Sequence, residues 1–189
     1  MSFFERRRFL WILFLIGLAL IAVAARATTL ARLSFRELAA RADTIVHARC
    51  LASESRFESG EIWTFSQFEV FSAPKGLVPG LVTVRTLGGR ANGLVSVVED
   101  APRFTLGEEV YLFLVPSRAA GFQVLGWAQG TFRIRRDPRT GRDTVTQDSA
   151  ALAVFDPATR TFRRDGIRNL SLAEFEERLR AGLRETPQE

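Results

Sequence analysis

The fold of this chain is decided by a run of alternating residues, Thr44-Ile45-Val46-His47-Ala48-Arg49-Cys50-Leu51-Ala52. Successive side chains of a β-strand point to opposite faces, so a period of two is typical of a strand. One face carries Val46, Ala48, Cys50 and Ala52, and the other carries Ile45, His47, Arg49 and Leu51. The run therefore predicts a strand that begins near Thr44.

Further segments of strand character follow, separated by turn residues. Glu61–Ala73 is rich in aromatic and β-branched residues and ends at Pro74-Lys75-Gly76, while 110–115 is apolar on both faces, as in a strand that is buried on both sides. The others are 81–86, closed by Gly88-Gly89, 94–98 within a long loop over 90–105, 122–125, 131–135, and short strands flanking 137–141 and 156–157. We interpret Gly88-Gly89-Arg90 as a turn, because no helix follows it to cradle a phosphate.

Two capping boxes predict peripheral helices. Ser34 and Glu37 have the spacing for a short N-terminal helix, and Ser171 and Glu174 have it for an amphipathic C-terminal helix over about 171–183. The polar tail after Leu183 is interpreted as disordered. The fold class is therefore all-β with peripheral helices, in a single barrel-like domain over 28–189.

The N-terminus has the order of a signal peptide. Arg6, Arg7 and Arg8 precede an uninterrupted apolar run over 9–25, and Ala25-Arg26-Ala27 is a cleavage motif. Residues 1–27 are thus predicted to be removed, which leaves Thr28 as the first residue of a secreted or periplasmic protein. The alternative is an uncleaved anchor that holds the chain in the inner membrane by residues 9–25.

Composition limits the partners. The formal net charge is +5, but four of the arginines lie in the predicted signal segment, so much of the basicity belongs to targeting. Export argues against a nucleic-acid partner. We expect the chain to contact a membrane only if its signal segment stays uncleaved. Cys50 is the only cysteine, so an intramolecular disulfide is impossible and packing must stabilise the domain.

Enzyme sites fit the sequence poorly. His47 is the only histidine, and positions three apart on a strand face opposite ways, so it points away from Cys50. One His and one Cys do not make a zinc site without several carboxylates. The paired acids Glu99-Asp100, Glu108-Glu109 and Glu176-Glu177 are interpreted as solvated surface, and His47 as a surface histidine beside a buried thiol. We therefore expect no catalytic, cofactor or metal site, and no enzyme.

Arginines concentrate in the C-terminal third of the chain. Nine of them fall between Arg133 and Arg168, and Phe132 and Ile134 alternate with Arg133 and Arg135. A basic sheet face would follow, suited to an anionic polymer or lipid. We favour a mixed-charge, solvated face instead, because acids such as Asp137 and Asp143 are interspersed.

Three segments resemble a known family when taken in order: Ala42-Asp43-Thr44-Ile45-Val46-His47-Ala48-Arg49, then Phe68-Glu69-Val70-Phe71-Ser72-Ala73-Pro74-Lys75-Gly76, then Gly107-Glu108-Glu109-Val110-Tyr111-Leu112-Phe113-Leu114. They resemble netrin-like domains and the tissue inhibitors of metalloproteinases, and also a group of uncharacterised bacterial secreted proteins. The resemblance implies an OB-like, five-stranded Greek-key barrel with accessory helices, and binding rather than catalysis.

The resemblance also implies a mechanism. In those inhibitors the amine and carbonyl of the first mature residue bind the protease's zinc, a role that Thr28 would take here, although the inhibitors have a cysteine at that place. We expect an exported binding module with a protein partner, a metalloprotease being one candidate, and a contact surface of Thr28, Thr29, Arg90, Asn92, Gly93 and Pro102. The alternative is a structural or adhesive envelope protein that binds anionic polymer or lipid through its Arg-rich face.

Overall fold

A computed structural model describes residues 31–164 and 166–185, which belong to one compact unit. The predicted signal peptide, Thr28, Thr29 and most of the predicted disordered tail lie outside the described residues. In the described part of the chain, no helix has both the length and the apolar character needed to cross a membrane.

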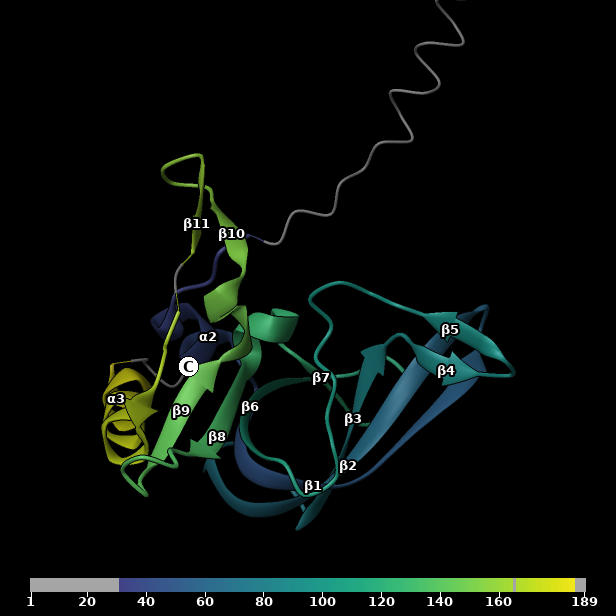
Figure 1. Cartoon of the computed structure of the whole chain (residues 1–189), viewed down its shortest axis with the longest axis horizontal. Coiled ribbons are helices and arrows are strands. Elements are labelled where there is room, and N and C mark those ends of the chain that lie inside the picture. The colour runs from purple at the N-terminus through teal and green to yellow at the C-terminus, as the bar shows by residue number, and fades with distance from the viewer. Residues whose placement is uncertain (1–30, 165, 186–189) are drawn as a thin grey trace, which may run out of the picture. The chain divides into compact units, whose positions relative to one another are not determined.

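Most of the unit is β-structure, as predicted, and its largest sheet has eight strands (Figure 1). These strands are β1 (Thr44–Glu58), β2 (Glu61–Lys75), β3 (Leu81–Leu87), β6 (Glu109–Pro116), β7 (Phe122–Val124), β8 (Thr131–Arg136), β9 (Asp143–Gln147) and β12 (Leu170–Ser171). Two hairpins stand apart from it, β4 (Gly89–Ala91) with β5 (Leu94–Ser96), and β10 (Ala153–Asp156) with β11 (Thr161–Arg164). Two short 3-10 helices, η1 (Trp127–Gly130) and η2 (Asp148–Ala151), connect strands.

The sheet is mixed, because one of its pairings is parallel. Its order is β1-β2-β3-β7-β6-β8-β9-β12, and β1 also pairs with β6 over residues 44–49. The parallel link between β3 and β7 consists of a single residue pair, Val84 with Phe122. The sheet is not a closed barrel, so the structure confirms an all-β fold with peripheral helices but does not confirm the five-stranded barrel.

Strand β1 organises the sheet, because it pairs along its length with β2 and at its start with β6. The predicted alternation holds for Val46, Ala48 and Cys50, which are fully buried together. The prediction for Ala52 is wrong: it is exposed, because the register with β2 shifts between Cys50 and Ala52. A bulge of this kind moves the next side chain to the other face.

Two hydrophobic clusters lie within the described unit. One contains Val46, Ala48 and Cys50 with side chains from β2, β3 and β6. The other joins the sheet to the two α-helices, and in it the Phe35 ring meets the rings of Phe113, Phe132 and Phe175 edge-on at centroid distances of 5.7 to 5.8 Å. Ile45, on the opposite side of β1, belongs to this second cluster. Both faces of the first half of β1 are therefore buried.

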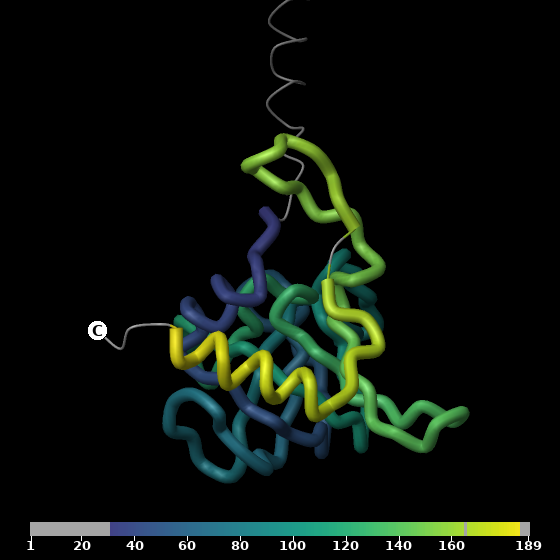
Figure 2. The backbone as a smooth tube through the Cα atoms, turned by 90° about the vertical axis from the view of Figure 1, so that its left-hand side faces the viewer, coloured from purple at the N-terminus to yellow at the C-terminus, as the bar shows by residue number. Residues whose placement is uncertain are grey.

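Both predicted helices are present and both capping boxes are formed. Helix α2 covers Phe35–Arg41 and α3 covers Leu172–Arg184, and each N-cap serine accepts a hydrogen bond from the backbone of the glutamate three residues on. In α3 the buried residues are Phe175 and Leu179, which face the sheet and α2. Figure 2 shows α3 crossing one side of the unit, with the β10–β11 hairpin projecting beyond the rest.

The long loop predicted over 90–105 is more ordered than expected. Gly89 and Arg90 belong to β4, not to a turn, and β4 pairs with β5 across Asn92-Gly93. Asn92 and Gly93 both have positive φ, at 50° and 75°, as a tight Asn-Gly hairpin turn requires. The Asn-Gly pair was therefore the signal for a hairpin.

Candidate anion-binding site

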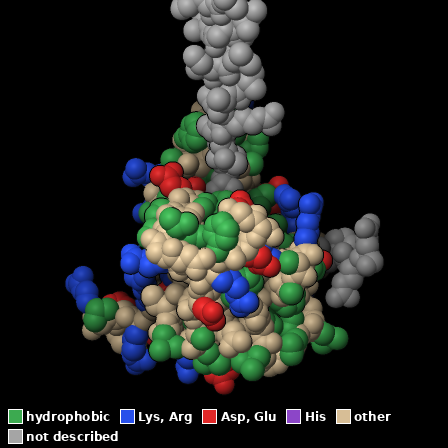
Figure 3. Space-filling view, turned by 90° about the vertical axis from the view of Figure 1, so that its right-hand side faces the viewer, with side chains coloured by type: hydrophobic (Ala, Val, Ile, Leu, Met, Phe, Trp, Pro, Cys, Tyr) green, Lys and Arg blue, Asp and Glu red, His purple; other side chains and the backbone are tan. Residues whose placement is uncertain are grey.

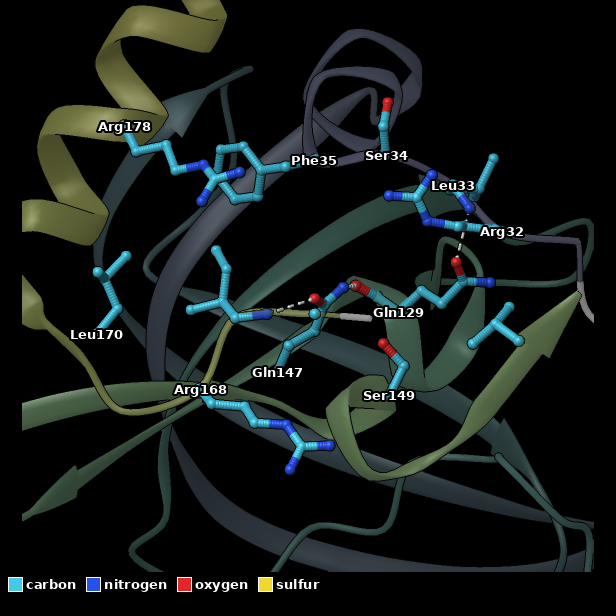
Figure 4. A pocket seen from close by; sticks show the side chains of 13 residues that line it. Arg32, Leu33, Ser34, Phe35, Gln129, Gln147, Ser149, Arg168, Leu170 and Arg178 are labelled. Carbon is cyan, nitrogen blue, oxygen red and sulfur yellow. Dashed lines mark hydrogen bonds between the residues drawn. The ribbon is translucent and has the colours of Figure 1, made fainter. Parts of the chain in front are cut away.

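A polar cavity of the described unit lies where α2, η1, β9, η2 and α3 come together. Its volume is about 340 Å³. Figure 4 shows its side chains arriving from segments far apart in the sequence, with Arg32 and Phe35 at one end of the chain and Arg168, Leu170 and Arg178 at the other. We call it the arginine cavity.

Two buried glutamines build the wall of the arginine cavity. The Gln129 side chain accepts a hydrogen bond from the Leu33 backbone at 2.7 Å and donates one to the Ala31 carbonyl at 2.9 Å. Gln147 donates to the Gln129 carbonyl at 2.6 Å and accepts from the Ile167 backbone at 3.2 Å. These side-chain amides bind the segment that precedes α2 and the segment that precedes β12. The wall is therefore held in place by hydrogen bonds within the chain.

Three arginines line the cavity from three separate segments: Arg32 before α2, Arg168 before β12, and Arg178 on α3 (Figure 4). The Arg178 guanidinium lies over the Phe35 ring, 5.2 Å from its centroid. Arg168 donates a hydrogen bond to the Ala150 carbonyl of η2. The guanidinium groups are thus positioned by the aromatic ring and the backbone.

Among the described residues, the carboxylate of Asp156 lies near Arg32 but does not line the cavity. Asp156 is 3.7 Å from the Arg32 guanidinium and accepts hydrogen bonds from the backbone of Ala158 and Thr159. Burial raises the pKa of Asp156, but these hydrogen bonds and the charge of Arg32 outweigh it and hold the pKa below its usual value. Asp156 therefore stays ionised and offsets part of the charge of Arg32.

None of the described residues that line the arginine cavity is acidic. Three positive charges around one cavity repel one another, and a cavity wall weakens the screening by water. An anion placed among them would relieve that repulsion and could accept guanidinium hydrogen bonds. The arrangement is suited to binding an anionic group.

A neighbouring cavity of about 360 Å³ shares Gln147 and Arg168 with the first, but it differs in having a carboxylate, Asp148, in its lining. Arg133 lines it and forms hydrogen bonds with Asp148 at 2.5 and 2.7 Å, with Glu108, and with the Arg103 carbonyl. Burial lowers the pKa of Arg133, but the hydrogen bonds and charges of the two carboxylates outweigh it and raise the pKa. This arginine is neutralised internally.

The Arg133 network bears on two predictions: it agrees with a face of mixed charge, and it corrects the solvated position predicted for Glu108. The Arg-rich strand β8 does not present a uniform basic face, because Arg133 is paired while Arg135 and Arg136 are exposed. Glu108, predicted to be solvated surface, has a side chain that is only 14% exposed and binds Arg133. The pairing was not visible in the sequence because Glu108 and Asp148 lie 25 and 15 residues from Arg133.

His47 is also more enclosed than predicted. Its ring stacks on Tyr111 at 4.6 Å, and its Nε2 lies 2.7 Å from Glu109 Oε1. Cys50 is fully buried on the other side of β1, where burial raises the pKa of its thiol. The opposite orientation of His47 and Cys50 is confirmed. No cluster of metal-binding side chains occurs among residues 31–164 and 166–185.

The structure brings together only part of the predicted contact surface. Arg90, Asn92 and Gly93 are exposed on the β4–β5 hairpin, beside exposed Leu94 and Val95. Pro102 is buried and lines a different, smaller cavity. Figure 3 looks onto the side of the unit that carries this hairpin, where hydrophobic side chains reach the surface among residues of both charges.

Sequence reasoning missed Arg32, Arg178, Gln129 and Gln147. No short motif joins them, because they come from four segments that meet only in the folded chain. Arg168 was noted, but as one of nine arginines in a basic region. No family model matches the chain, and no match was found among the curated proteins or the solved structures.

Proposed function

We propose that this chain is an exported, non-catalytic binding module of OB-like architecture, and that its arginine cavity holds an anionic group of its partner. The observation that carries the proposal is the convergence of Arg32, Arg168 and Arg178 on one cavity with no acidic residue among its described lining. Anionic polymer of the cell envelope is the partner class that this charge favours.

The order of strand pairing supports the OB-like architecture. The links β1–β2, β2–β3, β3–β7, β7–β6 and β6–β1 return to the first strand, and the link between β3 and β7 is parallel. OB-folds are partly open five-stranded Greek-key barrels, and they bind through their strands and loops rather than by a fixed chemistry. On this proposal β8, β9 and β12 extend the barrel sheet beyond β6.

A matched pair of variants on α3 tests the binding site. Arg178 lines the cavity, whereas Arg180, two residues on, does not, and both are exposed. Arg178→Gln and Arg180→Gln remove the same charge from the same helix. On phosphocellulose, Arg178→Gln should elute at clearly lower salt than the unmodified protein, while Arg180→Gln should elute close to it.

Equal losses in the two variants would mean that only overall charge matters, and the proposed cavity would be wrong. Titration with inorganic phosphate provides the second measurement, because a single anion tests the cavity without the contribution of a charged surface. Saturable binding of phosphate supports the site if its affinity is lower in Arg178→Gln than in the unmodified protein and is unchanged in Arg180→Gln.

A protein partner is the second candidate. It is favoured by exposed apolar residues in the β4–β5 hairpin and in the segment that directly follows it. Leu94, Val95 and Val97 are 57%, 59% and 68% exposed, and clustered exposed apolar side chains are typical of protein contacts. A metalloprotease is the partner that the resemblance implies, with Thr28 at the zinc. Inhibition of a metalloprotease that does not depend on salt, by protein whose intact mass shows that it begins at Thr28, would support this candidate. Salt-sensitive retention on anionic material would support the first candidate.

A further inference from the structure

A third cavity, which contains Pro102, shares no lining residue with the arginine cavity and is built differently. Its volume is about 90 Å³, room for about three water-sized groups. Two tryptophans, Trp63 of β2 and Trp127 of η1, contribute to its walls together with the buried Pro102 and with Arg85 of β3. We call it the tryptophan cavity.

Arg85 is the charged group of the tryptophan cavity, and it is only 7% exposed. Its guanidinium carbon lies 3.9 Å from the centroid of the Trp63 ring and 5.4 Å from that of Phe65. Stacking of this kind holds a guanidinium in one orientation and leaves its N–H groups free to donate in the plane. The cation is therefore positioned before any ligand arrives.

The hydrogen bonds of Arg85 are incomplete. Its Nε is buried and has no hydrogen-bond partner among the residues that the structure describes. Its ion pair is with Glu58, at 3.4 Å, longer than a good charge-assisted hydrogen bond, and the Glu58 side chain is 43% exposed. A buried donor without a partner costs about 1–3 kcal/mol. Because Arg85 lines the cavity, a ligand that enters it and reaches this guanidinium could supply the missing acceptor.

The rim of the cavity is held in a strained conformation. Trp127 has φ of 56°, in the left-handed region that large side chains rarely adopt, and Asp100 has φ of 62°, which an aspartate adopts more readily. The Ala128 backbone donates a hydrogen bond to the Asp100 carbonyl at 3.1 Å, which ties the two segments together. Strain of this kind is concentrated at binding sites, where the surrounding structure must impose it.

We infer that the tryptophan cavity binds a carboxylate carried on a short apolar stem. A carboxylate accepts two parallel hydrogen bonds from the edge of a guanidinium, so it would satisfy Nε. The indole rings would contact the stem, and the volume of about 90 Å³ excludes a large ligand. The carboxylate can belong to a free small acid or to the C-terminus of a peptide. This inference does not depend on the arginine cavity.

The direct measurement is the nitrogen–proton NMR signal of the Arg85 Nε–H. It is assigned as the signal that disappears in Arg85→Lys, which keeps the charge but lacks the guanidinium. Propionate should shift the signal saturably, and propionamide, which has nearly the same shape but no charge, should not. Equal shifts with the two compounds, or no saturation with propionate, would overturn the inference.

Two further variants keep the test valid if replacement of Arg85 impairs folding. Glu58→Gln removes the partly competing carboxylate and should tighten propionate binding about two- to fivefold. Trp127→Gly removes one wall and also relieves the positive φ, so it should weaken binding about two- to tenfold without loss of stability. Unchanged affinity in both variants would also contradict the site.

Peptides distinguish the two sources of the carboxylate. A tripeptide Gly-Gly-Ala with a free C-terminus is compared with the same peptide as its C-terminal amide. Tighter binding of the free peptide than of propionate would identify a peptide end as the ligand, whereas binding of propionate alone would identify a free small acid. Failure of both probes to shift the Nε–H signal would exclude the carboxylate site.

Discussion

Replacement of Arg133 by glutamine gives the sharpest test of the buried charge network. The side chains of Arg133, Glu108 and Asp148 are 16%, 14% and 18% exposed. Glutamine keeps most of the length but removes the charge, so both carboxylates lose their cation in a poorly solvated place. Removal of one partner from a buried ion pair costs about 3–5 kcal/mol, and we expect the lower end, about 3 kcal/mol, because some solvent reaches all three groups.

Urea unfolding followed by circular dichroism measures this loss. With a slope of about 2 kcal/mol/M for a domain of this size, the midpoint should fall by about 1.5 M. Arg135→Gln is the matched control, because Arg135 is exposed on the same strand, and its effect should stay within about 0.5 kcal/mol. A loss below about 1 kcal/mol in Arg133→Gln, or an equal loss in the control, would refute the network as a stabilising element.

Three further predictions follow from the core and from the titrating groups. Phe175→Ala removes a fully buried ring between α3 and the sheet and should lower the free energy of unfolding by about 3–5 kcal/mol, measurable by the same urea titration. Hydrogen bonds from the N-cap serines lower the pKa of Glu37 and Glu174 in the folded state, so the melting temperature should fall as the pH drops below about 4, where the unfolded chain binds more protons. Burial and the hydrogen bond to Glu176 raise the pKa of Tyr111. As the pH rises, the unfolded chain therefore loses this proton before the folded chain does, and the free energy of unfolding should fall above about pH 10. Tyr111→Phe should remove that part of the loss of stability at alkaline pH.

The sequence predicted the features that depend on neighbours along the chain. The capping boxes at Ser34 and Ser171 each involve residues three apart, and both helices begin where these predict. The alternation after Thr44 likewise needs only adjacent residues. Local geometry dictates these elements, so a single sequence is enough to place them.

Features that depend on distant residues were missed or misread. Ala52 fits the alternation, but pairing with β2 introduces a bulge that exposes it. Arg133 fits a basic strand, but carboxylates from two other segments neutralise it. The arginine cavity depends on Gln129 and Gln147, whose amides have no local signature. Burial and pairing across the fold decide these cases, and a linear pattern does not contain them.

The position of Cys50 has a practical consequence for following the motions of this domain. Its thiol is fully buried in the strand that pairs with both β2 and β6, and the chain has no other cysteine. A thiol reagent can therefore label the protein only when the middle of the sheet opens, and the labelling rate under native conditions measures the free energy of that opening. The chain thus carries its own single-site reporter of sheet opening, and no engineered label is needed.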